Sequence, residues 1–140
     1  MESKVVWQDG MAFAAELDGH HFTIDAAAEH GGRDLGPRPK GLVVSALIGC
    51  TAMDVISILR KMRQDVTTFA VTGQAELTED HPKQFSTIRV VYRAEGTIDR
   101  ERFLRAVELS EDRYCGVSAT LRPSVTLTSE VWLNEEKIQG

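Results

Sequence analysis

Two cysteines, Cys50 and Cys115, are the residues of this chain best suited to covalent chemistry. Two are too few for the disulfide framework of a small secreted protein, so they are free thiols, a redox pair or inert residues of the core. Cys50 lies in a long apolar run, where a free cysteine usually packs as a small hydrophobic side chain. Cys115 is far from it along the chain, which leaves their distance in space open.

The residues around each cysteine favour different roles. Asp54 follows Cys50 by four positions, which places both on one face of a helix. A carboxylate raises the pKa of a neighbouring thiol, so a cation from elsewhere is required to favour the thiolate. Cys115 stands at the end of one predicted helix and before a second near Val117, whose N-terminus would lower a thiol pKa. Cys115 is therefore a primed thiol or a resolving partner.

The other metal-ligating and glycine-rich residues form no recognised motif. The chain has four histidines, none in an HExxH motif or beside a CxxC pair: His20, His21, His30 and His81. A zinc site made of both cysteines and two of these histidines is a third hypothesis for the thiols. The segment 31–36 lacks the GxGxxG spacing and the Lys-Ser/Thr ending of a phosphate-binding loop. We therefore predict no cofactor and assign no metal ligands.

Length and charge limit the class of protein. The 140 residues, with 42% hydrophobic and 26% charged side chains, suit one domain, which we place over residues 1–140. The net charge of −5 excludes the basic field of a nucleic-acid-binding domain. The first residues show no signal peptide, so we expect a cytoplasmic protein, where a cysteine pair is more often catalytic or redox-active than structural.

A long apolar helix is predicted from Pro39 to about Arg63. Its most apolar part, residues 42–59, is nearly long enough to cross a membrane, but it carries Asp54 at mid-depth. A charge at the bilayer centre is costly, so we predict a buried helix and no membrane partner. A helix that is apolar on all sides in a soluble protein must be enclosed on most of them.

The remaining elements are mostly strands. Asp-Gly turns separate the first three apolar segments, which predicts a three-stranded antiparallel meander over residues 4–7, 11–17 and 20–25. A loop over residues 26–41 precedes the long helix. The elements that follow it are strands 69–77 and 85–94, a helix over 100–114, a short helical turn over 117–121 and a last strand over 124–133. This order predicts an α+β fold with mainly antiparallel sheet.

Several of these segments together closely resemble the OsmC/Ohr family of thiol peroxidase-like proteins, in particular its YhfA-like branch. The segments that carry the resemblance are 36–42, 46–55, His81-Pro82-x-x-Phe85, Ile98-Asp99 and 106–121. The similarity extends from Val6 to about Thr128. It is specific because two separate cysteine motifs occur in the family's order.

The resemblance implies an OsmC-like fold and an intertwined homodimer. In that family two long central helices, one from each subunit, are wrapped by antiparallel sheet, and the sites lie at the subunit interface. A second copy of the chain would account for the apolar helix, since one small protomer could not cover it. An obligate interface of this kind resembles a protein core divided between two chains.

The resemblance also implies roles for the cysteines. Cys50 matches the peroxidatic cysteine of the family, and Cys115 matches the resolving one. In the hydroperoxide resistance branch, the first thiolate attacks a peroxide and becomes a sulfenic acid, which the second thiol converts into a disulfide that a dithiol reductant reopens. The implied activity is reduction of organic hydroperoxides in a stress or detoxification role, with a small apolar peroxide as substrate.

The chain departs from the family's active branch at two charged positions. That branch has a Glu at or next to the position of Lys40-Gly41 and an Arg in the first hairpin, and neither is present here. Arg33 or Arg38, in the loop before the long helix, is the candidate replacement for the cation. The missing Glu favours an alternative of another class, a non-catalytic OsmC-like protein that binds an apolar ligand at the dimer interface.

Overall fold

The computed structural model describes all residues from Met1 to Gly140. The chain divides into two compact units, an N-terminal unit of residues 1–43 and a C-terminal unit of residues 44–140. The single OsmC-like domain over residues 1–140 stays a prediction.

The N-terminal unit is the predicted meander. Its strands β1 (Ser3–Asp9), β2 (Ala12–Leu17) and β3 (His20–Ile24) pair antiparallel in the order β1-β2-β3. Both turns use left-handed backbone, with φ of 55° at Gly10 and of 47° and 83° at Asp18 and Gly19. Asp and Gly adopt this conformation readily, which is why the two Asp-Gly pairs mark the turns correctly.

A buried carboxylate organises the loop that follows β3. Asp25 is only 3% exposed and accepts hydrogen bonds from the backbone N–H groups of Ala26, Arg33 and Leu35. Burial alone would raise the pKa of Asp25, but the three backbone donors outweigh it and lower the pKa. The loop, which includes the short helical turn η1 (Ala28–His30), is thus held around one fixed negative charge.

The long helix α1 (Pro39–Lys61) begins at the predicted proline and ends two residues before the predicted Arg63. Four residues at intervals of four are buried on one stripe: Leu47, Thr51, Val55 and Leu59. The helix is long and apolar enough to cross a membrane. Its most apolar stretch of 18 residues has a mean hydropathy of 2.2, yet only 22% of that stretch is buried. The expected enclosure on most sides is therefore not met within one chain, where Met53 is 74% exposed.

The C-terminal unit contains a four-stranded sheet in the order β4-β5-β6-β7. Its strands are β4 (Asp65–Leu77), β5 (Phe85–Thr97), β6 (Thr126–Leu133) and β7 (Glu136–Gln139). The pairs β4–β5 and β6–β7 are antiparallel, as predicted for most of the sheet. The pair β5–β6 is parallel, because the helical segment 100–121 crosses over between these two strands and returns the chain in the same direction.

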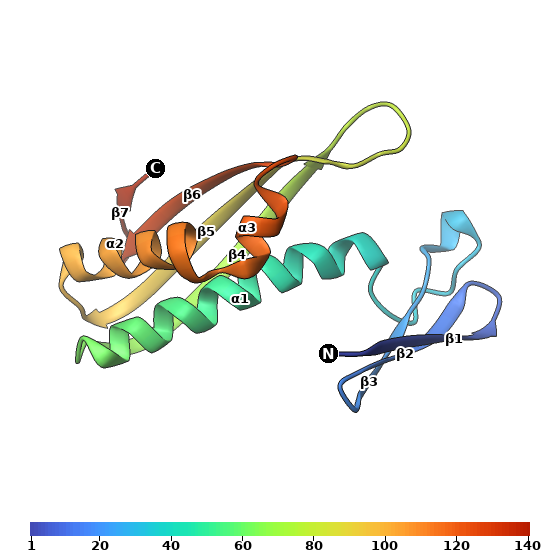
Figure 1. Cartoon of the computed structure of the whole chain (residues 1–140), viewed down its shortest axis with the longest axis horizontal. Helices are drawn as coiled ribbons and strands as arrows, with labels where there is room; N and C mark the ends of the chain where they lie inside the picture. The colour runs from blue at the N-terminus through green and yellow to red at the C-terminus, as the bar shows by residue number, and fades with distance from the viewer. The chain divides into compact units, whose positions relative to one another are not determined.

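The helices cover one face of this sheet (Figure 1). Alternate residues of β5, from Ile88 to Ala94, point into a core shared with α1 and with α2 (Arg100–Leu109). Helix α2 starts where the sequence predicts, since the Asp99 side chain accepts a hydrogen bond from the N–H of Arg102. The same core includes Phe103, which is fully buried against the sheet.

The predicted helix over 100–114 is wrong in its last part. After α2 the chain forms a π-helical turn, η2 (Ser110–Tyr114), and then the short helix α3 (Gly116–Leu121). A π turn holds more residues than an α turn, so it shifts the side-chain phase. Ser110, where the turn begins, still lies on the buried face of α2, whereas Tyr114, expected on the buried stripe, comes after the shift and is 52% exposed.

Candidate functional site

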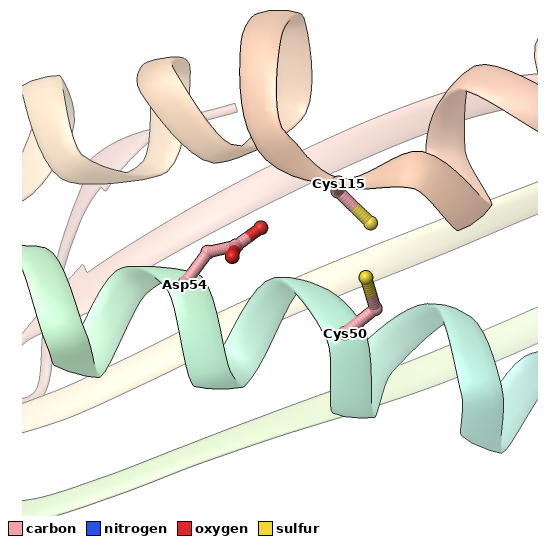
Figure 2. Close-up of side chains that lie close together, drawn as sticks. All are labelled: Cys50, Asp54 and Cys115. Carbon is pink, nitrogen blue, oxygen red and sulfur yellow. The ribbon is translucent and has the colours of Figure 1, made fainter.

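The structure brings the two cysteines together within the C-terminal unit. Cys50 on α1 and Cys115 at the start of α3 point their sulfur atoms toward one another (Figure 2). The two side chains are hydrogen-bonded, and both sulfurs and a carboxylate oxygen of Asp54 lie within 4.8 Å of one another. Both cysteines are free thiols, Cys115 buried and Cys50 half-buried. The alternative of two unrelated core thiols is therefore less favoured than a pair.

Close packing of α1 on β4 fixes the position of Cys50. Gly73 of β4 faces α1, and a Cβ atom added there would lie 2.7 Å from Val44 and 2.9 Å from Ile48. Only glycine allows the helix to approach the strand this closely. Cys50 follows Ile48 by two residues, so this contact sets the depth of the helical turn that carries the thiol.

The break after the π turn positions Cys115. This residue has extended backbone, and its sulfur caps α3 by accepting a hydrogen bond from the N–H of Ser118 at 3.4 Å. The N–H of Val117 is hydrogen-bonded to the sulfur of Cys50. Both sulfur atoms thus face the first free amides of α3, as the predicted short helix near Val117 suggested for Cys115.

Electrostatics at Cys50 favour the protonated thiol. Burial raises the pKa of Cys50 above its ordinary 9.0, and the hydrogen bond to Cys115 raises it further. The amide of Val117 lowers the pKa, whereas the nearby charge of Asp54 raises it. The sequence already indicated that Asp54 would raise the pKa of Cys50. Because the raised pKa disfavours the thiolate, a cation is needed to lower it.

Neither of the predicted cations is part of the C-terminal unit. Arg33 lies 3.4 Å from the carboxylate of Asp9, and Arg38 forms an ion pair and hydrogen bond with Asp34, all within the N-terminal unit. Each arginine side chain is more than 40% exposed, so its charge is screened by solvent. Their role toward Cys50 stays a prediction.

The cluster does not contain the set of ligands that a structural zinc ion requires. It offers two sulfurs and one carboxylate oxygen, whereas a closed zinc site uses four ligands. None of the four histidines belongs to it, unlike the zinc set considered from the sequence. We therefore assign no metal to these residues.

A run of hydroxyl groups beside the cysteines was missed from the sequence. Tyr92 lies 2.7 Å from Thr51 through their hydroxyl oxygens, and Thr51 lies 2.8 Å from the hydroxyl of Ser110. Ser110 donates to Asp54 at 3.0 Å, and Tyr92 donates to Glu111 at 3.1 Å. The available signal was a threonine on the buried stripe of α1, where an apolar residue is usual.

Glu111 lies at the far end of this run, beside a small cavity of about 160 Å³. Residues from the sheet, the π turn and α3 line the cavity, among them Tyr92, Ser118 and Arg122. Burial raises the pKa of Glu111, which the hydrogen bonds from Tyr92 and Ser129 only partly oppose. This carboxyl is thus disposed to keep a proton that an exposed glutamate would lose.

A second cavity, of about 360 Å³, lies within the N-terminal unit and is mainly apolar. Val5, Met11, Phe13 and Ile24 of the meander and its turn line it, with Arg38 at its edge. Its apolar lining suits an apolar molecule.

The fold and the paired thiols define an OsmC-like protein. Residues 30–130 match the family model described as OsmC-like protein, and the chain belongs to that family. It is 35% identical over 130 residues to the protein YhfA of Escherichia coli K12, a match that covers 91% of this chain and 94% of that protein. The resemblance inferred from the sequence is therefore confirmed.

Solved structures confirm the fold class. A hypothetical protein from Aquifex aeolicus is 27% identical and superposes with a TM-score of 0.84, over 95% of each chain. The organic hydroperoxide resistance protein OhrB of Bacillus subtilis is 21% identical with a TM-score of 0.67, over 94% of this chain and 98% of that one. At that identity the second comparison concerns the fold alone.

Proposed function

We propose that this protein reduces organic hydroperoxides through Cys50, with Cys115 as the resolving thiol. The observation that carries the proposal is the pair of facing sulfur atoms, which come from distant segments of the chain and share a hydrogen bond. Membership of the OsmC-like family adds support, since solved members of this fold include a named hydroperoxide resistance protein.

The proposed reaction has two covalent steps. The thiolate of Cys50 attacks the terminal peroxide oxygen, so an S–O bond forms, the O–O bond breaks, and an alcohol leaves after taking up a proton. The thiolate of Cys115 then attacks the sulfenic sulfur, which forms the disulfide and releases water after a second proton is taken up. A dithiol reductant then reduces the protein disulfide to two thiols and is itself oxidised to a disulfide, which supplies the two electrons.

The thiolate of Cys50 needs a positive charge, and we assign this role to Arg38 or Arg33. Both lie in the loop before α1 and are the candidate replacements for the cation that the family's active branch has and this chain lacks. The carboxylate of Asp54 raises the pKa of Cys50, so a cation near the thiol would lower the pKa and offset the effect of Asp54.

We further propose that the protein is a cytoplasmic homodimer in which a second α1 covers the exposed apolar side of the first. The support is the contrast between the high mean hydropathy of α1 and its small buried fraction within one chain. Sedimentation of the purified protein without detergent is expected to give twice the mass of the 15.5 kDa chain. A monomer, or a protein soluble only in detergent, would contradict this assembly.

The peroxidase proposal is tested with single cysteine variants in the presence of a dithiol reductant. Cys50→Ser is expected to abolish consumption of an alkyl hydroperoxide, because the attacking sulfur is gone. Cys115→Ser is expected to react once and then become over-oxidised, because no resolving thiol remains. Intact mass of the wild type after mild peroxide treatment should show one intramolecular disulfide. Equal, slow consumption by wild type and Cys50→Ser would overturn the proposal.

One observation favours a second function. The apolar cavity of the N-terminal unit has a volume suited to the tail of an apolar ligand. Native mass spectrometry that finds a retained apolar molecule, together with thiols that do not react with peroxide, would favour the non-catalytic binding protein instead.

A further inference from the structure

Four hydrogen-bond contacts in the C-terminal unit join two carboxyl groups through three hydroxyls. In order, the members are Asp54, Ser110, Thr51, Tyr92 and Glu111. We call the three hydroxyl residues in the middle the hydroxyl relay. All three are at most 1% exposed, so bulk water does not compete for their hydrogen bonds.

The number of hydroxyl hydrogens in this run of five side chains does not match the number of contacts between them. Three hydroxyls supply three hydrogens, yet there are four oxygen–oxygen contacts, none longer than 3.1 Å. If Ser110 donates to Asp54 and Tyr92 donates to Glu111, the single hydrogen of Thr51 can serve only one of its two neighbours. The remaining contact then brings two hydroxyl oxygens together with no hydrogen between them, which is unfavourable in a buried setting.

One added proton on either carboxyl completes all four hydrogen bonds. We propose that Asp54 and Glu111 share one proton through the hydroxyl relay, and that the relay delivers this proton to the oxygen that leaves at the cysteine pair. The second half of the proposal rests on the peroxidase function proposed above. The first half, the shared proton, does not.

The proton moves without any hydroxyl becoming ionised. Each hydroxyl passes its own hydrogen forward and receives one from behind, so a proton that starts on Glu111 ends on Asp54 with the three hydroxyls reversed. Burial raises the pKa of Tyr92 far above its ordinary value, which keeps this hydroxyl protonated in either direction.

At the cysteine end, the delivered proton balances both covalent steps. When the Cys50 thiolate takes an oxygen from the hydroperoxide, the leaving alkoxide accepts the proton from Asp54 and departs as an alcohol. When the Cys115 thiolate attacks the sulfenic acid, the leaving hydroxide accepts a proton in the same way and departs as water. In each step the thiol has first released its own proton to solvent, so no net proton is consumed.

At the other end, the small cavity gives Glu111 access to solvent for reloading. The charged groups that face Glu111 there are Arg122, which lowers its pKa, and Asp112, which raises it. Cys50 and Cys115 face Asp54 on one side, and Lys61 and Tyr114 line a cavity of about 550 Å³ together with this carboxylate on the other. The relay thus connects the carboxyl beside the small cavity to the carboxyl beside the cysteines.

The shared proton is tested by infrared spectroscopy in H2O and D2O. At about pH 6, where an ordinary glutamate is ionised, the wild type is expected to show the carbonyl band of a protonated carboxyl. Glu111→Gln should remove or shift this band, whereas Glu108→Gln, which alters an exposed glutamate paired with Arg105, should leave it unchanged. Absence of the band from the wild type would overturn the shared proton, whether or not the protein reduces peroxides.

Proton delivery is tested with Tyr92→Phe, which removes one hydroxyl from the relay and little else. Reaction of Cys50 with an alkyl hydroperoxide is expected to slow by about tenfold or more, within the range of general acid catalysis. Alkylation of Cys50 by iodoacetamide, followed on the Cys50 peptide, should change by less than about twofold, because iodide leaves without a proton. Tyr114→Phe alters the chain's other tyrosine, which lies outside the relay, and is the matched control.

Asp54→Asn separates the two effects of the carboxyl. Loss of the charge lowers the Cys50 pKa, so alkylation should become faster, while reaction with the hydroperoxide should become slower because the proton donor is gone. Equal changes in both reactions, in this variant or in Tyr92→Phe, would overturn proton delivery. If the wild type fails to react with any hydroperoxide, the peroxidase function falls, and the infrared result alone decides the shared proton.

Discussion

Two carboxyl groups in this molecule, one buried and one half-buried, have opposite environments. Asp25, in the N-terminal unit, accepts three backbone N–H bonds, and its pKa is lowered. Glu111, in the C-terminal unit, has side-chain hydroxyls as its partners, and its pKa is raised. Burial acts in the same direction on both, so the kind of donor decides the result.

The difference follows from the chemistry of the donors. A backbone N–H can only donate and cannot rotate away, so three of them fix a negative charge and make it structural. A hydroxyl can donate or accept, so a run of hydroxyls transmits a proton and does not hold a charge in place. The loop around Asp25 is therefore built for rigidity, and the region between Glu111 and Cys50 is built for protonation change.

The largest effect expected from this contrast is in the pH dependence of Cys50. Burial, Cys115 and Asp54 raise its pKa above 9.0, so unless an arginine acts on the thiol the thiolate fraction should rise about tenfold for each pH unit from neutral pH up to that raised pKa. Alkylation rates of the Cys50 peptide between about pH 6 and pH 10 measure it. A plateau reached below pH 8 would show that a cation acts on the thiol in the assembled protein.

Stability should depend on pH in opposite senses at the two carboxyls. The lowered pKa of Asp25 adds stability above its ordinary 3.8, and this stability is lost as the pH falls through the folded value. The raised pKa of Glu111 acts in reverse, adding stability below 4.5 that is lost as the pH rises through the folded value. Acidification from neutral pH should thus strengthen the π turn first and loosen the loop later.

Matched amide substitutions make this contrast measurable at neutral pH. Asp25→Asn is expected to lower the thermal midpoint and to speed hydrogen exchange at the amides of Arg33 and Leu35, which lose a charged acceptor. Glu111→Gln is expected to leave the midpoint unchanged or raised, because a carboxyl disfavoured in its charged form is removed. Destabilisation by both substitutions to the same degree would remove the distinction drawn between the two regions.

Most of the framework could be predicted from the sequence because it depends on local rules. Alternating apolar residues and Asp-Gly turns located the meander, and Pro39 located the start of α1. Strand β7 was missed because its turn has left-handed backbone at Asn134 and Glu135, and a glutamate is not an expected residue there. The π turn was missed because a search for helical periodicity assumes a constant number of residues per turn.

The site could be predicted only in part, for a different reason. The order of the cysteine motifs identified Cys50 and Cys115, but their approach in space depends on how α3 packs over α1. Thr51 and Ser110 were missed because a small hydroxyl residue in a helix has many ordinary roles. Their significance comes from the contacts of Tyr92 on a strand distant in sequence, which no local pattern contains.

The smallest effects are expected at the two arginines of the N-terminal unit. Arg33 and Arg38 form exposed pairs with Asp9 and Asp34, and such pairs contribute about 0–1 kcal/mol, so substitution by Gln should change the free energy of unfolding by no more than about 1 kcal/mol. The arginine that serves Cys50 should nevertheless slow its alkylation at neutral pH when replaced. Arg105→Gln, which breaks a comparable exposed pair in the C-terminal unit, is the control. If neither Arg33→Gln nor Arg38→Gln slows the reaction, neither arginine serves Cys50, and the α3 amides are left to stabilise the thiolate. The fixed charges of the N-terminal unit would then have no part in the chemistry of the cysteine pair.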